Sequence, residues 1–434
     1  MNKSFDAIII GAGVIGASIA FALAQRGWRT LNIDKQPAAG YGSTANSCAV
    51  IRTHYSTLQG TALAWENIFA WKDWGGFLGV EDELGLAQYR PTGILVLKQH
   101  ESDYQAFREH HRALGIPFED WGRQQLAERM PWLNLNTYGP PRLPDEAGFG
   151  EANGQVQHAL FLPEGGYVND PGLAAHNLQR AAEAHGAQFR FKQEVSAIRQ
   201  EGGRAAGVTL NGGAQIDSPV VINAAGPHSF LINEMAGVTA GMNISTRPMR
   251  HEVHYTPAPE GLDYDRIGPM LSDDDVGGYS RPEVGNKLLV GSLDPACDPE
   301  EWVDDPDTFD REVTTERWEA QVYRMALRLP GLPIPTHPAG VADLYDVTED
   351  WIPVYDKSDL PGFYMAVGTS GNQFKNAPVA GQMMAELVEA CENGLNHDQV
   401  PFKYACRNTV QVIDLEFYSR LRQVNTDSSF SVLG

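Results

Sequence analysis

Residues 7–27 read AIIIGAGVIGASIAFALAQRG, a short apolar run followed by closely spaced glycines and an alanine-rich segment of helical character. A strand that ends in a glycine turn and leads into a helix is typical of a site for the pyrophosphate of a dinucleotide. Gly11 permits the tight turn, Gly13 lets the backbone approach the phosphates, and Gly16 lets the helix pack closely on the sheet. The stretch therefore predicts a nucleotide-binding unit at the start of the chain.

A second strand is expected at residues 28–33, after Gly27 has ended the helix at its C′ position. Asp34 follows this strand, at roughly the twenty-residue offset where an acid accepts hydrogen bonds from an adenosine ribose. A glycine triplet alone is common in loops. The order of strand, glycines, helix, strand and acid makes the prediction specific, and the acid indicates a ribose without a phosphate.

Size and charge limit the partners of this chain. It has 434 residues and a formal net charge of −22, which favours two domains and argues against nucleic acid and anionic membrane surfaces. No apolar run reaches membrane-spanning length, so we expect a soluble, cytoplasmic protein without membrane insertion that acts on small molecules. The four cysteines, Cys48, Cys297, Cys391 and Cys406, are scattered without metal-ligand spacing, so neither disulfides nor a bound metal is expected.

Two later segments have the pattern of the same sheet. Asp170 and Pro171 begin a helix that ends at Gly186, and a buried strand at 219–223 leads into small residues. Near the end, a strand at 362–368 precedes a helix at 378–391. We therefore predict an α/β fold in which 1–86, 165–246 and 342–394 form a discontinuous nucleotide-binding domain, 87–164 and 247–341 form a substrate domain, and 395–434 is a C-terminal extension.

Five separated motifs now occur in order: the glycine turn with Asp34, GSTANS at 42–47, GGYVNDP at 165–171, NAAGP at 223–227 and GTSGNQFKNAP at 368–378. Together they resemble the flavin-dependent amine and amino-acid oxidases of the D-amino-acid oxidase family, nearest to the sarcosine oxidase branch. The resemblance implies bound FAD, a Rossmann-like FAD-binding domain, a substrate domain built on a mixed antiparallel sheet, and oxidation of a C–H bond next to nitrogen.

The motifs and the resemblance also assign site residues. The expected FAD contacts are Gly11, Gly13, Val14, Ile15, Gly16, Asp34, Lys35, Gly42, Ser43, Thr44, Asn46, Ser47, Val195, Ala224, Ala225, Gly226, Gly371, Asn372, Gln373, Phe374 and Lys375. By similarity, Arg52 and Lys375 bind a substrate carboxylate and Tyr345 faces the substrate. The plainer alternatives are a surface arginine paired with an acid, a solvated loop lysine and a core tyrosine. His54 and His251 are candidate proton carriers, and each is equally a packed or surface histidine.

Departures from the family pattern are informative. Some relatives attach FAD covalently through a histidine in the early loop or a cysteine before the tyrosine motif, and Asn46 and Asp343 stand at those places here. FAD is therefore expected to bind noncovalently. Cys48, close to that loop, is expected to be a small buried residue. Leu289 stands where some relatives have a lysine that promotes reaction with oxygen, and Leu293 stands where they have a catalytic-site histidine. The electron acceptor is therefore left open between O2 and a redox partner.

The leading hypothesis is oxidation of the C–N bond of a carboxylate-bearing secondary amine or amino acid by hydride transfer to flavin N5, with hydrolysis of the imine. One alternative is an FAD-dependent 2-hydroxy acid dehydrogenase on the same fold. Another is the flavin subunit of a multi-subunit amine dehydrogenase complex. The chain could also form an oligomer with copies of itself. The apolar run of the C-terminal extension, with Val410, Val412, Ile413, Leu415 and Phe417, fits either an interface or a cap on the protein's own core.

Overall fold

The computed structural model describes residues 5–433, apart from the side chain of Ile267. Its first sheet has six strands in the order β11-β2-β1-β15-β22-β21, of which the first five are parallel and β21 is antiparallel to β22. Three distant parts of the chain therefore meet in one sheet. The strands are β1 (Ala7–Ile10), β2 (Thr30–Ile33), β11 (Gln188–Arg190), β15 (Val220–Asn223), β21 (Val354–Lys357) and β22 (Phe363–Val367).

Three helices cover one face of this sheet and share an apolar cluster with it. Helix α1 (Val14–Gln25) lies between the other two and packs against both α6 (Pro171–Ala184) and α10 (Ala377–Glu392). The side chain of Asp170 caps α6 by accepting a hydrogen bond from the backbone N–H of Leu173 at 2.8 Å. The other face packs on a small sheet and on α7 (Ser229–Ala236). That sheet contains β12 (Val195–Glu201), β13 (Arg204–Leu210) and β14 (Gln215–Asp217).

The second large sheet has eight strands in the order β20-β16-β19-β18-β17-β5-β9-β6, all antiparallel to their neighbours except the parallel pair β17 and β5. Helix α9 (Thr315–Arg328) packs on this sheet. The strands are β5 (Ile94–Leu97), β6 (Glu119–Gly122), β9 (His158–Leu162), β16 (Arg247–Pro257), β17 (Met270–Asp273), β18 (Gly278–Glu283), β19 (Lys287–Ser292) and β20 (Gly340–Val347). The predicted fold class, a parallel Rossmann-like sheet with a mixed, mostly antiparallel second sheet, is confirmed.

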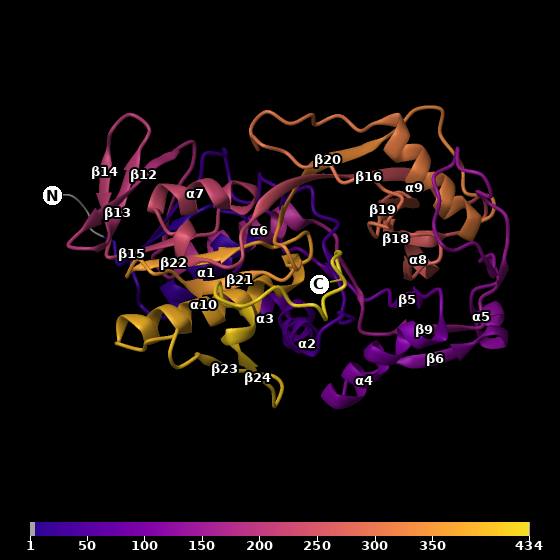
Figure 1. Cartoon of the computed structure of the whole chain (residues 1–434), viewed down its shortest axis with the longest axis horizontal. Coiled ribbons are helices and arrows are strands. Elements are labelled where there is room, and N and C mark those ends of the chain that lie inside the picture. Colours follow the sequence, from indigo (N-terminus) through magenta and orange to yellow (C-terminus); the bar gives the residue numbers. More distant parts are fainter. Residues whose placement is uncertain (1–4, 434) are drawn as a thin grey trace.

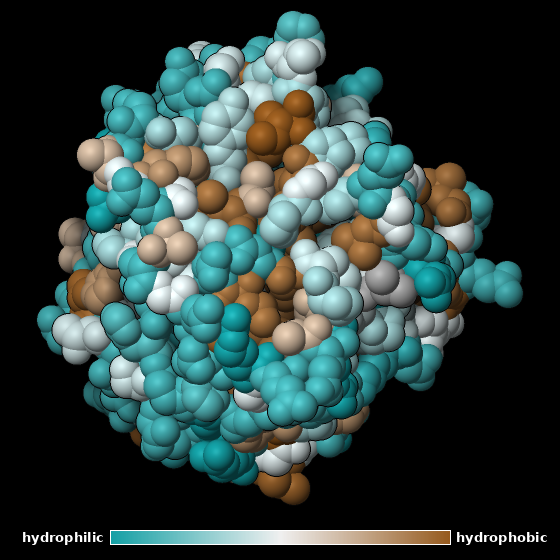
Figure 2. Space-filling view, turned by 90° about the vertical axis from the view of Figure 1, so that its right-hand side faces the viewer, coloured by the Kyte–Doolittle hydropathy of each residue, from teal (hydrophilic) through white to brown (hydrophobic). Residues whose placement is uncertain are grey.

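Figure 1 shows the two sheets beside each other, with β16 and β20 running from one toward the other. The face at the far end of the second sheet is mostly hydrophilic, with smaller hydrophobic groups near its middle (Figure 2).

No helix within residues 5–433 is long and apolar enough to cross a membrane. The remaining α-helices and β-strands are α2 (Leu58–Lys72), α3 (Trp74–Leu78), α4 (Gln105–Leu114), α5 (Arg123–Arg129), α8 (Tyr264–Ile267), β3 (Val50–Ile51), β4 (Tyr89–Arg90), β7 (Asn136–Thr137), β8 (Gly154–Gln155), β10 (Gly166–Val168), β23 (Lys403–Ala405) and β24 (Val412–Asp414).

The C-terminal extension splits between core and surface. Ile413 and Leu415 are buried in the apolar cluster that also contains α1, α6 and α10, whereas Val410 is 95% exposed and Val412 59% exposed. Part of the apolar run therefore caps the protein's own core. Beyond this hairpin, the chain continues to Val432 and Leu433, which are buried in two apolar clusters that contain residues of the second sheet.

At the glycine turn, the backbone of Gly11 lies so close to that of Ala224 that position 11 does not tolerate a side chain. Its φ is +104°, and a Cβ added there would lie 2.3 Å from the carbonyl oxygen of Ala224. Gly27 also has a positive φ, +84°, but a Cβ there would meet nothing within 4 Å. We expect Gly27→Ala to lower the free energy of unfolding by about 1 kcal/mol and Gly11→Ala by at least about 3 kcal/mol, measured by urea unfolding. Equal losses in the two variants would contradict the role assigned to the close contact.

Candidate active site

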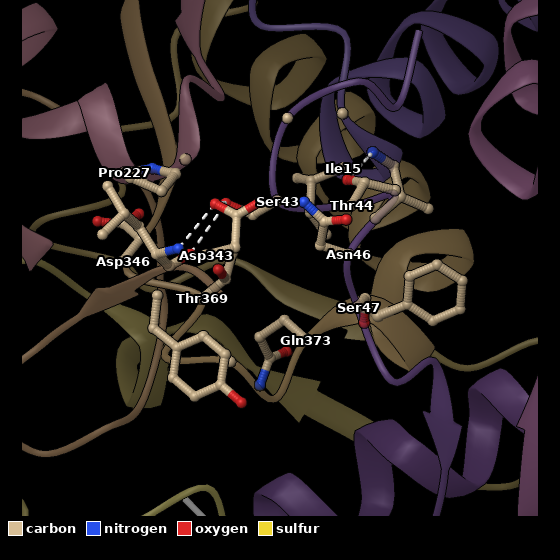
Figure 3. A pocket seen from close by; sticks show the side chains of 18 of the residues that line it. Ile15, Ser43, Thr44, Asn46, Ser47, Pro227, Asp343, Asp346, Thr369 and Gln373 are labelled. Atoms are coloured by element: carbon tan, nitrogen blue, oxygen red, sulfur yellow. Dashed lines mark hydrogen bonds between the residues drawn. The ribbon is translucent and has the colours of Figure 1, made fainter. Parts of the chain in front are cut away.

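A cavity of about 400 Å³ lies where the parallel strands of the first sheet end and the second sheet begins. The residues that follow β1, β2, β15 and β22 all line it, as expected for an open α/β sheet, where ligands bind outside the carboxyl ends of the strands. Figure 3 shows Ser43, Thr44 and Asn46 around this cavity together with Asp346, Thr369 and Gln373 from later segments. The fold thus brings residues of four of the five motifs to this cavity, whereas the motif at 165–171 does not line it.

All of the residues expected to contact FAD line this cavity except Gly16. Gly16 is instead buried behind the turn, where an added Cβ would lie 2.0 Å from the carbonyl oxygen of Gly11. Its lack of a side chain therefore serves helix packing. Lys35 lines the cavity, but its ammonium is paired with Asp307 at 2.5 Å and contacts the His228 ring nitrogen at 2.9 Å.

Asp34 organises the nucleotide end of the cavity. Its carboxylate accepts hydrogen bonds from the backbone N–H of Ala12 at 2.7 Å and of Gln36 at 2.8 Å. A carboxylate oxygen can accept more than one hydrogen bond, so both oxygens retain capacity for a ligand hydroxyl. Next to it, the backbone N–H of Val14 donates to Thr44 Oγ1 at 3.1 Å, which joins the glycine turn to the loop at 42–47.

Asn46 and Asp343, the two positions at which the family resemblance implies a covalent attachment in some relatives, contact each other in this chain. The amide of Asn46 donates to the carboxylate of Asp343 at 2.6 Å, and Ser43 Oγ donates to the same carboxylate at 3.2 Å. Ser43 Oγ also lies 2.9 Å from the carbonyl oxygen of Leu344. These contacts hold the loop at 42–47 against the start of the motif that carries Tyr345.

Two buried cations face the other end of the cavity. Arg52 is 5% exposed and Lys375 is 3% exposed, and among residues 5–433 neither forms an ion pair with an acid. Both lie over the ring of Tyr55, with the Arg52 guanidinium carbon 4.2 Å and the Lys375 Nζ 5.0 Å from its centroid. Their hydrogen bonds go to neutral carbonyls: Arg52 donates to His54 and Val432, and Lys375 donates to Asn372 at 2.5 Å.

Burial has a clear electrostatic consequence for these cations. It lowers the pKa of Lys375 well below its ordinary value, and the positive charge of Arg52 adds to this effect. It also lowers the pKa of the Arg52 guanidinium. A ligand anion would offset the cost of burying both charges, and a guanidinium suits a carboxylate because its planar fork donates two parallel hydrogen bonds.

Tyr345 and His251 form an aromatic wall of the same cavity. Their rings are stacked with centroids 4.0 Å apart. His251 Nδ1 lies 3.7 Å from Asp294 Oδ1; the side chain of Asp294 is 20% exposed, and its other oxygen is buried without a hydrogen-bond partner among residues 5–433. Burial lowers the pKa of His251 to about 3, with a further contribution from Arg317, and raises the pKa of Asp294 to about 8, with a further contribution from the charge of Asp298. The pair is therefore neutral near pH 7.

The two candidate histidines have different surroundings. His54 does not line the cavity, since its ring packs edge-on against Phe107 with centroids 5.5 Å apart. Both of its ring nitrogens are buried without a hydrogen-bond partner, and burial lowers its pKa well below the ordinary value. The structure thus puts His251, and not His54, at the cavity. Cys48, which was expected to be buried, is only partly buried, and it contacts the Tyr279 hydroxyl at 2.9 Å.

Several cavity residues carried no signal in the sequence. They come from the second sheet, from the loop before α9 and from the end of the chain, and no motif includes them. Asp294, which contacts His251 but does not itself line the cavity, was also missed; its left-handed backbone, with φ of +56°, is visible only in the structure. The missed lining residues include Val253, Met270, Ser272, Tyr279, Pro306, Asp307, Phe309, Arg311, Val432 and Leu433.

A second group of polar residues lies outside the cavity. Ligand atoms of Asp82, Glu83 and His176 are within 4.8 Å of one another, a spacing that the sequence did not reveal. Asp82 is hydrogen bonded to His176 at 2.8 Å, and Glu83 pairs with Arg180. These pairs account for the grouping without a metal ion.

The comparisons with known proteins agree on one family. The family described as FAD dependent oxidoreductase (DAO) matches residues 6–387. Glycine oxidase of Geobacillus kaustophilus is 25% identical over 415 residues, which are 93% of this chain and 97% of that protein. Sarcosine oxidase subunit beta of Rhodobacter capsulatus is 25% identical over 392 residues, 89% of this chain and 85% of that protein. The structure of L-proline dehydrogenase from P. horikoshii has a TM-score of 0.75 at 23% identity and covers 97% of this chain and 98% of its own.

The protonated state of Asp294 can be tested through stability. A carboxyl whose pKa is raised in the folded protein stabilises it at low pH, and this contribution is lost as the pH rises toward about 8. Replacement by the neutral amide removes that loss. We expect Asp294→Asn to gain stability relative to wild type between pH 6.5 and 8, by up to about 1.4 kcal/mol per pH unit.

The measurement is urea unfolding across this pH range. The matched control is Asp304→Asn, because the side chain of Asp304 is 99% exposed. The control should follow wild type at every pH. A pH-independent difference between Asp294→Asn and wild type would show that the carboxyl is already ionised at pH 6.5.

Proposed function

We propose that this chain oxidises the C–N bond of a carboxylate-bearing secondary amine or amino acid, with FAD held noncovalently in the cavity. The chain belongs to the family of FAD dependent oxidoreductases, and this membership is the starting point of the proposal. The observation that carries this proposal is the pair of buried cations, Arg52 and Lys375, which have no acid partner among residues 5–433. A substrate carboxylate is the ligand that would complete this arrangement.

The residues of the nucleotide end fit FAD. Gly11 and Gly13 line the cavity at the N-terminus of α1, where the backbone can approach a pyrophosphate and the helix dipole favours its charge. Asp34 retains acceptor capacity for the ribose. Asn46 and Asp343, which hydrogen bond to each other, offer neither the histidine nor the cysteine of the covalent attachments, and this supports noncovalent binding.

The chain's own residues would position the substrate. Arg52 and Lys375 bind its carboxylate, and the stacked rings of Tyr345 and His251 form a wall that limits how the rest of the molecule can turn. The positive charges disfavour a substrate ammonium, and the ring of His251, whose pKa is lowered to about 3, stays neutral beside them. Bound FAD supplies the hydride acceptor. Water then adds to the resulting C=N bond, which releases an amine and a carbonyl compound.

Arg52 gives the direct test of the carboxylate site. Arg52→Gln should raise the Kd of a carboxylate-bearing amine at least about thirtyfold, because a buried charge pair contributes ~2 kcal/mol or more. FAD content should stay unchanged. The measurement is anaerobic reduction of the bound flavin by a panel of N-methyl amines, amino acids and 2-hydroxy acids, with Arg266→Gln as control, since the side chain of Arg266 is 75% exposed.

The panel separates the alternatives. Bleaching by amines or amino acids supports the proposal, and bleaching by 2-hydroxy acids alone would replace it with a hydroxy acid dehydrogenase. Unchanged kinetics in Arg52→Gln would remove Arg52 from the substrate site.

The lowered pKa of Lys375 predicts how the affinity for a carboxylate depends on pH. Since its pKa is lowered, it loses its proton as the pH rises through a range below its ordinary value near 10.5. Only the charged form attracts a carboxylate, so the affinity should be highest at low pH and fall by up to about tenfold per pH unit above that pKa. Lys375→Met should bind weakly at every pH, with no such slope.

Titration of the holoenzyme with acetate between pH 6 and 10 measures this dependence. Lys403→Met is the control, because the side chain of Lys403 is 65% exposed, and it should keep the wild-type slope. A slope that persists in Lys375→Met would assign the pH dependence to another group.

A further inference from the structure

Residues 425–433 lead to the cavity, which Val432 and Leu433 line, and we name this segment the C-terminal strap. Just before it, the guanidinium of Arg422 forms a two-point pair with the carboxylate of Asp350 at 2.8 and 2.9 Å. The backbone N–H of Asn425 donates to the same carboxylate at 3.2 Å, and Ser428 Oγ donates to the Asp350 carbonyl at 2.5 Å. The strap is therefore held by several contacts before it reaches the cavity.

At its far end the strap is anchored beside Arg52. The backbone N–H of Ser429 donates to Ser56 Oγ at 3.2 Å, and the backbone N–H of Ser56 donates to the carbonyl of Leu433 at 3.2 Å. Between these two contacts lies Val432, whose carbonyl accepts a hydrogen bond from the Arg52 guanidinium. Ser56 thus fixes both sides of the carbonyl that contacts Arg52.

The strap contributes two apolar residues to the cavity wall. Val432 and Leu433 are 9% and 7% exposed, and both line the cavity. Val432 belongs to an apolar cluster with Met249, Val347 and Trp351. Leu433 belongs to a second cluster, which includes the cavity-lining residues Val253, Met270 and Tyr279.

Arg52 can hold the strap and a ligand at the same time. A guanidinium has five N–H donors, and the carbonyls of His54 and Val432 take one each. The remaining donors can bind a carboxylate. Because a carbonyl is neutral, it orients the guanidinium without cancelling its charge.

We propose that the C-terminal strap is a working part of the substrate site, in which the Val432 carbonyl positions Arg52 and the side chains of Val432 and Leu433 limit the size of the substrate. This inference rests on the proposed function, since it takes Arg52 as the carboxylate anchor. Val432 and Leu433 are positioning and specificity residues. A contrasting role is that the strap occupies the place of the substrate and competes with it.

Point variants of the holoenzyme test whether the side chains of the strap limit the size of the substrate. Acetate, propanoate, butanoate and pentanoate are titrated, with flavin absorbance and calorimetry as readouts. In Leu433→Ala the longer acids should gain affinity relative to acetate, by about fourfold for each further methylene that the enlarged cavity buries. Leu421→Ala makes the same change just before the strap at a residue that is 41% exposed and does not line the cavity, and it should keep the wild-type profile. Val432→Ala and Val424→Ala form a second matched pair, with Val424 42% exposed.

Removal of the strap tests the positioning of Arg52. A chain that ends at Val424 should retain FAD and bind acetate at least about tenfold more weakly, because Arg52 loses the carbonyl that orients it. Tighter binding of all four acids would identify the strap as a competitor and overturn the proposal. Should the shortened chain not fold, as judged by FAD content and circular dichroism, the point variants decide.

The outcomes distinguish the two proposals. If wild type binds none of the four acids, the carboxylate anchor fails, and the proposed function and the strap's role fail together. If wild type binds them and Leu433→Ala and Leu421→Ala have the same size profile, only the strap's role is overturned.

Discussion

The site depends on the burial of two positive charges beside one aromatic ring. Arg52 and Lys375 both face the ring of Tyr55, and only carbonyls accept their hydrogen bonds. Burying an ion without a counter-ion is costly, and cation–π contacts and carbonyls offset only a part of that cost. A cavity prepared in this way favours an anionic group over a neutral one, and this preference is the basis of the proposed substrate class.

The first sheet explains how several loops that are far apart in sequence reach one cavity. Lys375 follows β22 of this sheet, whereas Arg52 follows β3 of a separate three-stranded sheet and Val432 lies near the end of the chain. Parallel strands end at the same edge, so the loops after β1, β2, β15 and β22 are brought together whatever their separation along the chain. The second sheet closes the cavity, because β16 and β20 carry His251 and Tyr345 toward that edge. On the proposed function, this one cavity holds both the nucleotide and the substrate.

Sequence reasoning succeeded where a local pattern has a single physical cause. The five ordered motifs, which include the glycine turn with Asp34, were sufficient for the fold class, and Arg52 and Lys375 both line the cavity. It could not separate His54 from His251, because the packing of Phe107 against one ring and Tyr345 against the other is a tertiary property. For the same reason Asp294 and Leu433 were missed: an isolated acid and a leucine near the end of a chain have no periodicity or spacing that points to a cavity.

The neutral pair of His251 and Asp294 has a consequence for the charge balance of the site. An ionised carboxyl at position 294 would attract a substrate ammonium, whereas a protonated one leaves Arg52 and Lys375 as the dominant charges. Positive charges lower the pKa of a nearby amine, and a neutral amine carries the lone pair that assists departure of a hydride from the adjacent carbon. The features that bind the carboxylate would then also prepare the amine. On the proposed function, anchoring and activation of the substrate have one electrostatic origin, and Asp294 contributes to it by staying uncharged.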